Sequence, residues 1–416
     1  MNRSVEPSFV KGDITAPPSK SMTQRAIAAA LLANGTSVVT NPSGCDDSLA
    51  AMSIATGLGA DIIPGEKSLQ ITGSGKLRST HLNCGESGLA IRMFSPIAAL
   101  YGEEIIITGT GSLRKRPMSM ITDALDQLGV NCKSTDGHLP LTIRGPVRGG
   151  NIEIDGSVSS QLLTGLLMAL PVAEKDSAIR VRNLKSKPYI DMTIGILGKF
   201  GIRVHNDNYA SFLVAGNQKY LPVNYEVEGD WSGGAFLLVA AAINGNLSIY
   251  GLEPLSSQSD KSILNALEMA GASMIIRPGK IDISKSALRA FEFDATESPD
   301  LFPPLVALAS HSVGTSAIKG VSRLGYKESD RAAALQQEFG KMNIKTEIKG
   351  DLMFITGGTV RGAVVDSHGD HRIAMAAAVA ALASTGRVVI TGAEAVAKSY
   401  PGFFDDLCSI SAMITE

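Results

Sequence analysis

An internal repeat is the feature that most restricts how this 416-residue chain can fold. A short apolar strand, a polar loop, an Ala- and Leu-rich helix, a further strand, a second helix and another strand recur in this order six times, at a spacing of about 70 residues. The loops before the first helices read APPSKSMTQR (16–25), CGESGLAIR (84–92), DGSVSSQLL (155–163), EGDWSGGAF (228–236), ESPDLFPPL (297–305) and DSHGDHRIA (366–374).

The second helices of four repeats end alike, at LGA (58–60), LGV (128–130), FGI (200–202) and AGA (270–272). Glycine after a helix permits the left-handed conformation of a C-terminal cap. A unit with two helices and three or four strands can bury a core of its own, so the pattern predicts an α/β fold. The alternative is the loose similarity that βα units share in any α/β protein.

Each repeated loop carries Ser, Asp or Gly at the start of a helix, where backbone N–H groups have no intrahelical partner. These groups and the helix dipole attract anions. If the six loops face a common cleft, they form a strong anion-binding environment.

Composition excludes several other classes of protein. The chain has 38 basic and 40 acidic residues, a balance that argues against a protein that coats nucleic acid. Its longest apolar run, 373–383, is shorter than the roughly 20 residues that span a bilayer. The first ten residues lack the apolar core of a secretory signal, and the four cysteines form no CxxC pair. We therefore expect a reduced, cytoplasmic protein without a metal site.

Two basic segments of the first half have the chemistry of anion sites. Ser19, Lys20 and Ser21 open the first helix, and Arg25 follows one turn later on the same face. A plain serine cap with solvated basic residues is the alternative. The second segment, RKRP (114–117), is typical of a solvated loop, but it also suits closure over a phosphate.

The start of the third repeat supplies neutral donors. Ser159, Ser160 and Gln161 begin its first helix, and SKPYID adds Ser186 and Tyr189. Hydroxyl and amide groups of this kind can hold phosphate oxygens. Tyr189 either stacks on a ring or packs in the core.

Acidic and basic side chains mix in the second half. Asp300 follows a proline at a helix start, and Lys327 and Arg331 are spaced to share a helix face with Glu328 beside them. A salt-bridged surface is the alternative for this segment. Further basic groups stand at the start of the last repeat's helix and near the C-terminus, at Arg372 and Lys398. The chain has no GxxxxGK[ST], GxGxxG after a strand, GxSxG or HExxH motif.

Eight motifs in order make the chain resemble the family of 5-enolpyruvylshikimate-3-phosphate synthases. They lie between residues 17 and 404, which is nearly the whole chain, and read PPSKSMTQR, RKRP, DGSVSSQ, SKPYID, ESPD, YKESDR, GDHRIAM and AKSYPGFF. The resemblance implies the enolpyruvyl transferase fold, a two-domain inside-out α/β barrel with six βαβαββ-type units, three per domain.

The resemblance also implies where the domains begin and end. One domain covers 19–227, and a discontinuous domain combines 1–18 with 228–416, with the active site in the cleft between them. The sequence pattern alone would cut the chain near 220 and keep the first strand with the first half.

The reaction implied by the resemblance transfers the enolpyruvyl group of phosphoenolpyruvate to the 5-hydroxyl of shikimate 3-phosphate, with release of phosphate, in aromatic amino-acid biosynthesis. It requires no metal or organic cofactor. The partners are these two small-molecule substrates, without nucleic acid or membrane, and we expect a monomer.

Matching the family's motifs residue by residue implies three catalytic groups: Lys20, Asp300 and Glu328. The implied phosphoenolpyruvate-binding residues are Lys20, Gly88, Arg116, Gln161, Arg331, Arg372 and Lys398. The implied shikimate-3-phosphate-binding residues are Lys20, Ser21, Arg25, Ser159, Ser160, Gln161, Ser186, Tyr189, Asp300, Arg323 and Lys327.

The chain departs from the family pattern at three positions. Glu86 and Leu89 replace the amide and hydroxyl of the family's GNAGT or GNSGT loop, and Arg323 stands where asparagine is common. An acid near an anion site predicts weaker phosphoenolpyruvate binding, with Arg92 or Arg116 in compensation.

Two rival functions share the fold. One is enolpyruvyl transfer to UDP-N-acetylglucosamine, whose enzymes usually carry a reactive cysteine where this chain has RKRP and lack the SSQ and SKPY motifs. The other is a binding protein without catalysis, which the presence of Lys20, Asp300 and Glu328 argues against.

Overall fold

The computed structural model describes residues 1–325 and 327–416 and divides the chain into two compact units. Unit 1 comprises Met1–Pro17 and Glu228–Glu416, and unit 2 comprises Pro18–Val227. Tyr326, the first residue of the YKESDR motif, lies outside the described residues. Each unit holds three of the repeats predicted from the sequence.

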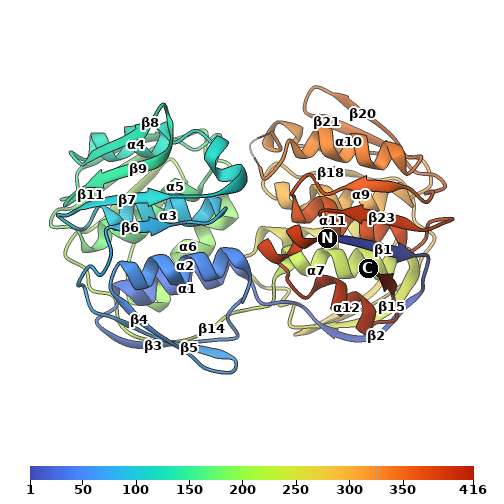
Figure 1. Ribbon diagram of the computed structural model, residues 1–416, viewed down its shortest axis with the longest axis horizontal. Helices are drawn as coiled ribbons and strands as arrows, with labels where there is room; N and C mark the ends of the chain where they lie inside the picture. Colours follow the sequence, from blue (N-terminus) through green and yellow to red (C-terminus); the bar gives the residue numbers. More distant parts are fainter. Residues whose placement is uncertain (326) are drawn as a thin grey trace. The chain divides into compact units, whose positions relative to one another are not determined.

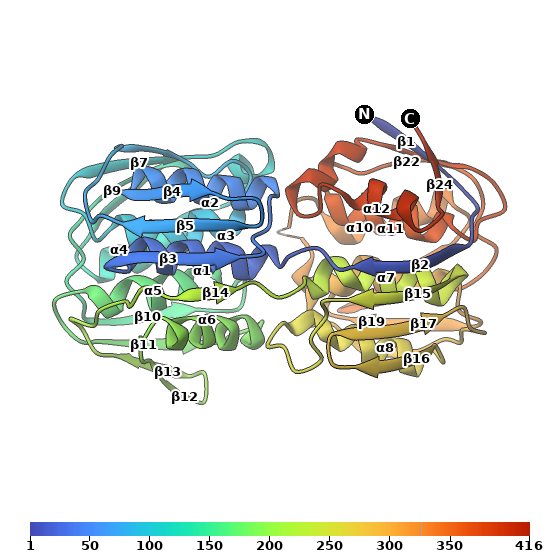
Figure 2. The same cartoon turned by 90° about the horizontal axis from the view of Figure 1, so that it is seen from below.

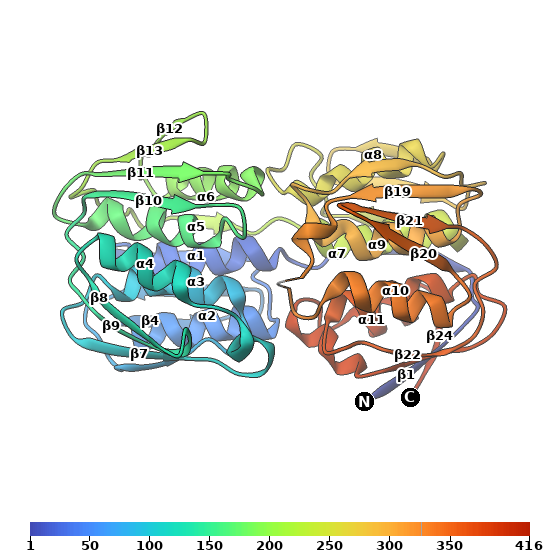
Figure 3. The ribbon, with the colours of Figure 1, turned by 90° about the horizontal axis from the view of Figure 1, so that it is seen from above.

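The described strands of unit 2 form three four-stranded sheets with one shared pattern. In each sheet an edge strand pairs in parallel with a second strand, and the third and fourth strands continue antiparallel (Figures 2 and 3). In order, the sheets are β14 (Asn224–Glu226), β3 (Gly35–Thr40), β5 (Ser68–Gly73) and β4 (Ala60–Pro64); β6 (His81–Asn83), β7 (Glu104–Thr108), β9 (His138–Arg144) and β8 (Asn131–Thr135); and β10 (Asn151–Asp155), β11 (Ser177–Arg182), β13 (Ser211–Val214) and β12 (His205–Asp207).

The sheets of unit 1 repeat this pattern. In order, they are β2 (Val10–Thr15), β15 (Gly245–Tyr250), β17 (Lys280–Ser284) and β16 (Ser273–Arg277); β18 (Glu292–Asp294), β19 (Thr315–Lys319), β21 (Leu352–Thr356) and β20 (Lys345–Lys349); and β22 (Val364–Asp366), β23 (Val388–Thr391), β1 (Asn2–Glu6) and β24 (Met413–Thr415).

The first helix of each repeat lies in the core of its unit (Figure 1). Every residue of α3 (Gly88–Ala98), α9 (Phe302–Ser310) and α11 (His371–Ala381) is buried, as expected for helices that are apolar on nearly all sides. Strand residues instead alternate between buried and exposed positions, which is typical of a sheet with one face in water. These first helices are α1 (Lys20–Leu32), α3 (Gly88–Ala98), α5 (Gln161–Ala169), α7 (Trp231–Asn244), α9 (Phe302–Ser310) and α11 (His371–Ala381).

The second helices end on a residue with left-handed backbone in all six repeats. The four predicted glycine stops, at 59, 129, 201 and 271, have positive φ. In the fifth and sixth repeats Asn343 (φ 69°) and Ser411 (φ 77°) take the same place, which the glycine pattern missed. These second helices are α2 (Asp46–Gly57), α4 (Ser119–Gln127), α6 (Lys187–Lys199), α8 (Ile263–Met269), α10 (Arg331–Lys341) and α12 (Phe403–Ser409).

The edge strands β2 and β14 each pair within the unit that the chain is about to leave, although the helix that follows belongs to the other unit. Strand β2 precedes α1 in the sequence but pairs with β15 of unit 1. Strand β14 precedes α7 but pairs with β3 of unit 2. Strand β1 completes the sixth repeat between β23 and β24. The N-terminal segment therefore belongs to unit 1. Within the described residues, no helix has the length and apolar character that a membrane span requires.

Two helical glycines of unit 2 differ in the space around them. A Cβ at Gly165 of α5 would lie 2.5 Å from the carbonyl oxygen of Arg92 on α3, whereas none of the surrounding atoms would lie within 4 Å of a Cβ at Gly195 of α6. We expect Gly165→Ala to lower the free energy of unfolding by about 1–3 kcal/mol, because α3 and α5 must separate.

The control, Gly195→Ala, should raise the free energy of unfolding by about 0.5–1 kcal/mol through helix propensity. Urea denaturation followed by circular dichroism measures both. Equal stability of the two variants would contradict the close packing of α3 on α5.

Candidate active site

The starts of the first helices of unit 2 lie together. Ser87, the N-cap of α3, donates from Oγ to Gln24 Oε1 on α1 at 3.2 Å. Arg92 of α3 donates from Nη1 to Oε1 of Gln161, the first residue of α5, at 3.0 Å. The starts of three helices therefore lie close together, and their dipoles stabilise an anion in this region.

A buried cation lies beneath these helix starts. The Arg25 side chain donates to Thr193 Oγ1 at 2.9 Å, to the Ser21 carbonyl at 2.9 Å and to Thr164 Oγ1 at 3.3 Å. Burial lowers the pKa of Arg25 to about 10. Among the described residues no carboxylate lies within ion-pair distance of Arg25, whose charge is therefore available to a bound anion.

Two further guanidinium groups lie against the first residue of α3. A Cβ at Gly88 would lie 2.5 Å from Arg116 Nη1 and 2.9 Å from Arg92 Nη1. Both arginines are buried, at 8% and 5% exposed. Glycine at position 88 thus lets two cations approach a helix N-terminus, as the predicted anion site requires.

Lys20 begins α1 after the N-cap Ser19, whose Oγ accepts from Met22 N at 3.5 Å. Its ammonium group pairs with Asp47 Oδ2 at 2.9 Å, and both side chains are mostly buried. The aspartate balances the charge of Lys20 and fixes its position.

The hydroxyl residues predicted from the third repeat stand at two helix starts. Ser160 is the N-cap of α5, and Ser159 Oγ accepts from Gln161 N at 3.2 Å. Ser186 is the N-cap of α6 and has left-handed backbone, with φ 57°. Its carbonyl accepts from Tyr189 N at 3.1 Å. A non-glycine residue in this conformation is strained, a feature that clusters at functional sites.

In unit 1 a single guanidinium group contacts three carboxylates. Arg331, the first residue of α10, donates from Nε to Asp370 Oδ2 at 2.9 Å, from Nη1 to Asp300 Oδ1 at 2.9 Å and from Nη2 to Glu328 Oε2 at 2.6 Å. The arginine side chain is 1% exposed. Burial alone lowers the pKa of Arg331, but the three carboxylates raise it overall, so this arginine stays charged.

Asp300 is the centre of a group of cations. It lies in the 3-10 turn Pro299–Leu301, and its carboxylate accepts from Lys327 Nζ at 3.2 Å and from Arg372 Nη2 at 3.2 Å, in addition to Arg331. Arg372 also donates to the Asp300 carbonyl at 3.1 Å. Burial lowers the pKa of Lys327. Proton-accepting and proton-donating groups therefore lie side by side here.

Two further predicted residues lie near this network. Lys398, at the end of the 3-10 helix Ala393–Lys398, donates to the Gly369 carbonyl at 3.3 Å. Burial lowers the pKa of Arg323, and Asp300 is among the acids that raise it. In the described part of the chain, His, Cys, Asp and Glu side chains form no group that could hold a metal ion.

The prediction that Lys327 and Arg331 share a helix face is wrong. Helix α10 begins at Arg331 behind the N-cap Asp330, so Lys327 precedes it. The Asp330 side chain accepts from Ala333 N and caps the helix, so α10 starts at Arg331, four residues after Lys327. Both cations nevertheless donate to Asp300 Oδ1.

The sequence did not point to Asp260, a carboxylate 2% exposed beside this network. It accepts a short hydrogen bond from Ser232 Oγ at the start of α7. Burial and the charge of Asp300 raise the pKa of Asp260 to about 6. Its surrounding motif, QSDKS, reads as an ordinary polar turn, so only burial distinguishes it.

Comparison with known proteins gives a consistent family. The family model described as EPSP synthase (3-phosphoshikimate 1-carboxyvinyltransferase) matches residues 5–407. A 3-phosphoshikimate 1-carboxyvinyltransferase from Clostridium kluyveri is 39% identical over 417 residues, covering 99% of this chain and 98% of that protein. One from Methanocorpusculum labreanum is 39% identical over 421 residues, covering 99% of both. A solved EPSP synthase structure from Acinetobacter baumannii has a TM-score of 0.83 and 27% identity, covering 100% of both chains.

Asp260 predicts a pH dependence of stability. The pKa of Asp260 is raised from 3.8 to about 6 in the folded chain. In the pH window between these two values, the folded chain keeps the Asp260 proton and the unfolded chain has lost it. The free energy of unfolding therefore falls as pH rises through this window. Asp260→Asn lacks the titration and still accepts from Ser232.

We expect the stability of Asp260→Asn relative to the wild type to rise between pH 4.5 and pH 7.5, on the order of 2 kcal/mol. Urea denaturation at the two pH values measures the difference. A difference that stays constant with pH would show that Asp260 does not titrate in this window.

Proposed function

This chain belongs to the EPSP synthase family, and on that premise we infer that it transfers the enolpyruvyl group of phosphoenolpyruvate to the 5-hydroxyl of shikimate 3-phosphate. Phosphate is the second product, and the reaction serves aromatic amino-acid biosynthesis. The residue assignments below rest on one observation, that the buried guanidinium of Arg331 contacts the carboxylates of both Asp300 and Glu328.

The reaction needs a proton acceptor and a proton donor. As the 5-hydroxyl oxygen bonds to C2 of phosphoenolpyruvate, Asp300 takes the hydroxyl proton and Glu328 delivers a proton to the C3 methylene. Glu328 then takes a proton back from the methyl group of the tetrahedral intermediate while the C2–phosphate bond breaks. Lys20 supplies positive charge, or a proton, to the departing phosphate, and the hydroxyl proton held by Asp300 ends on the phosphate, directly or by replacing the proton of Lys20. Each such acid–base group contributes about 10²–10⁴-fold to the rate.

Phosphoenolpyruvate carries a carboxylate and a phosphate, for which the chain offers cations from both units. Arg116 and Gln161 contribute at the helix starts of unit 2, and Gly88 makes room for Arg116. The bidentate fork of a guanidinium suits both anionic groups. The proposed set is Lys20, Gly88, Arg116, Gln161, Arg331, Arg372 and Lys398.

Shikimate 3-phosphate carries a phosphate and ring hydroxyls. In our proposal the hydroxyls of Ser159, Ser160 and Ser186 bind the 3-phosphate. Arg25, which donates to Thr193 on α6, adds positive charge. The proposed set is Lys20, Ser21, Arg25, Ser159, Ser160, Gln161, Ser186, Tyr189, Asp300, Arg323 and Lys327.

The proposed residues come from both units, with Lys20 in unit 2 and Asp300 in unit 1. We therefore propose that both units contribute residues to substrate binding, and that the two anionic ligands neutralise the clustered cations. A cytoplasmic, monomeric enzyme that works without nucleic acid, membrane or cofactor completes the proposal.

The first test is the acceptor requirement. We expect phosphate release from phosphoenolpyruvate with shikimate 3-phosphate and none with UDP-N-acetylglucosamine. Asp300→Asn should lower kcat by about 10²–10⁴-fold, because the proton acceptor is lost. The exposed Asp405→Asn is the matched control and should retain wild-type turnover. Phosphate release with UDP-N-acetylglucosamine and not with shikimate 3-phosphate would support the sister transferase instead. No phosphate release with either acceptor would support a binding protein.

The phosphate cradle predicts a selective defect at Ser186. Ser186→Gly removes the hydroxyl and keeps the left-handed backbone, so we expect the KM for shikimate 3-phosphate to rise about tenfold and the KM for phosphoenolpyruvate to stay unchanged. Ser411→Gly is the control, because it removes a hydroxyl from a left-handed residue at the end of α12. Steady-state kinetics with each substrate varied distinguishes the outcomes; an equal rise of both KM values would argue against a 3-phosphate contact.

A further inference from the structure

We propose that Glu86 is a positioning residue, which holds the 3-10 helix Gly111–Lys115, and with it Arg116, against the start of α3. Its consequence for phosphoenolpyruvate rests on the proposed function. The proposal runs against the expectation from sequence, which treated Glu86 as an acid that weakens an anion site.

The carboxylate of Glu86 accepts two hydrogen bonds from one residue of that 3-10 helix. Ser112 donates to Glu86 Oε2 from its backbone N at 3.0 Å and from Oγ at 3.1 Å. A third bond joins the same two segments, from Thr110 N to the Gly85 carbonyl at 2.7 Å. Bonds to an ionised acceptor are stronger than neutral ones, so Glu86 contributes most of this attachment.

Close packing fixes the carboxylate against the backbone. A Cβ at Gly111 would lie between 2.2 and 2.4 Å from the three atoms of the Glu86 carboxylate group, and Gly111 has φ 51°. A side chain at position 111 would therefore displace Glu86. Gly109 also lies close to the segment of Glu86, since a Cβ at position 109 would lie 3.0 Å from the Gly85 carbonyl oxygen.

The 3-10 helix transmits this attachment to Arg116. Leu113 is fully buried, and its carbonyl accepts from Arg116 N at 3.2 Å. Arg116 in turn is 8% exposed and has its Nη1 beside Gly88. Glu86 thus holds the backbone at one end of this short segment, and Gly88 leaves room for the arginine head group at the other end.

Charge gives a second reason for an acid at this place. Arg114, Lys115 and Arg116 are three consecutive cations, and the first two are exposed. Their mutual repulsion opposes an ordered turn that brings Arg116 inward. The carboxylate of Glu86 at the start of the same turn offsets that repulsion.

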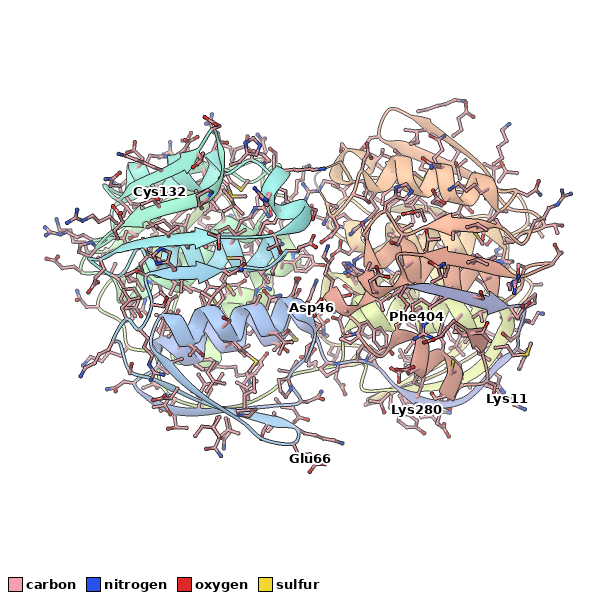
Figure 4. The ribbon with its side chains drawn as sticks, in the orientation of Figure 1. Lys11, Asp46, Glu66, Cys132, Lys280 and Phe404 are labelled. Atoms are coloured by element: carbon pink, nitrogen blue, oxygen red, sulfur yellow. The ribbon has the colours of Figure 1, made fainter. Side chains whose placement is uncertain are left out.

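The experiment compares Glu86→Ala and Glu86→Gln with Ser112→Ala and the Glu86→Ala/Ser112→Ala double variant. Glu66→Ala is the control, since Figure 4 shows Glu66 at the tip of the β4–β5 hairpin, where it is exposed. One readout is the rate of tryptic cleavage after Arg114 and Lys115 in the full chain, identified by mass spectrometry. The other is the KM for phosphoenolpyruvate and kcat.

We expect Glu86→Ala to raise both the cleavage rate and the KM for phosphoenolpyruvate about tenfold, with a smaller change in kcat. Ser112→Ala keeps the backbone bond and should give about a threefold effect. The double variant should cleave no faster than Glu86→Ala, because the two residues act through one contact. Glu86→Gln should fall between the wild type and Glu86→Ala.

Wild-type cleavage rates in Glu86→Ala and Ser112→Ala would overturn the proposal. So would a lower KM for phosphoenolpyruvate in Glu86→Gln, which is the result expected of an acid that merely repels the substrate. The cleavage readout needs no turnover, so a failure of the proposed function and a failure of this inference are distinguishable. If Glu86→Ala does not fold, Ser112→Ala and Glu86→Gln decide the question.

Discussion

The guanidinium group of Arg331 holds three carboxylates of unit 1 together. Its three nitrogens each donate to a different carboxylate, and those carboxylates come from the start of α11, the turn before α9 and the segment before α10. A buried charge of this kind is stable only while its partners remain, and the partners hold their geometry only while the charge remains. The repeat places α9, α10 and α11 so that this mutual dependence can arise.

The two units differ in the polar side chains that they bring together. Unit 2 gathers cations and hydroxyls at helix starts, with Arg25 lacking an acid partner among the described residues. Unit 1 brings the carboxylates of Asp260, Asp300, Glu328 and Asp370 near arginine and lysine, and burial and the charge of Asp300 raise the pKa of Asp260 to about 6. In our proposal both units supply cations to the anionic substrates, whereas the carboxylates that move protons, Asp300 and Glu328, both come from unit 1. The near-neutral composition conceals this division, because it averages over both halves.

Local signals allowed much of the fold to be predicted. Polar loops predicted the starts of the six first helices, and glycine predicted four of the six left-handed residues after the second helices. Asn343 and Ser411 were not predicted, because asparagine and serine tolerate the left-handed backbone without being typical of it. Three-dimensional partners were harder to predict. Spacing suggested one helix face for Lys327 and Arg331, and nothing near Glu86 in sequence revealed Ser112 as its partner. Nor does a strand's sequence state which sheet it joins, which is why the pattern alone assigned the first strand to the wrong half.

Strands β1 and β2 precede unit 2 in the sequence but belong to unit 1, and this order matters during synthesis on the ribosome. Unit 2 is complete once β14 has emerged, whereas β1 and β2, made first, find their partners only in β15, β23 and β24. Strands β1 and β2 are therefore without their native partners while unit 2 is synthesised. Charged residues in these strands, among them Arg3, Lys11 and Asp13, discourage pairing with other nascent chains in the meantime.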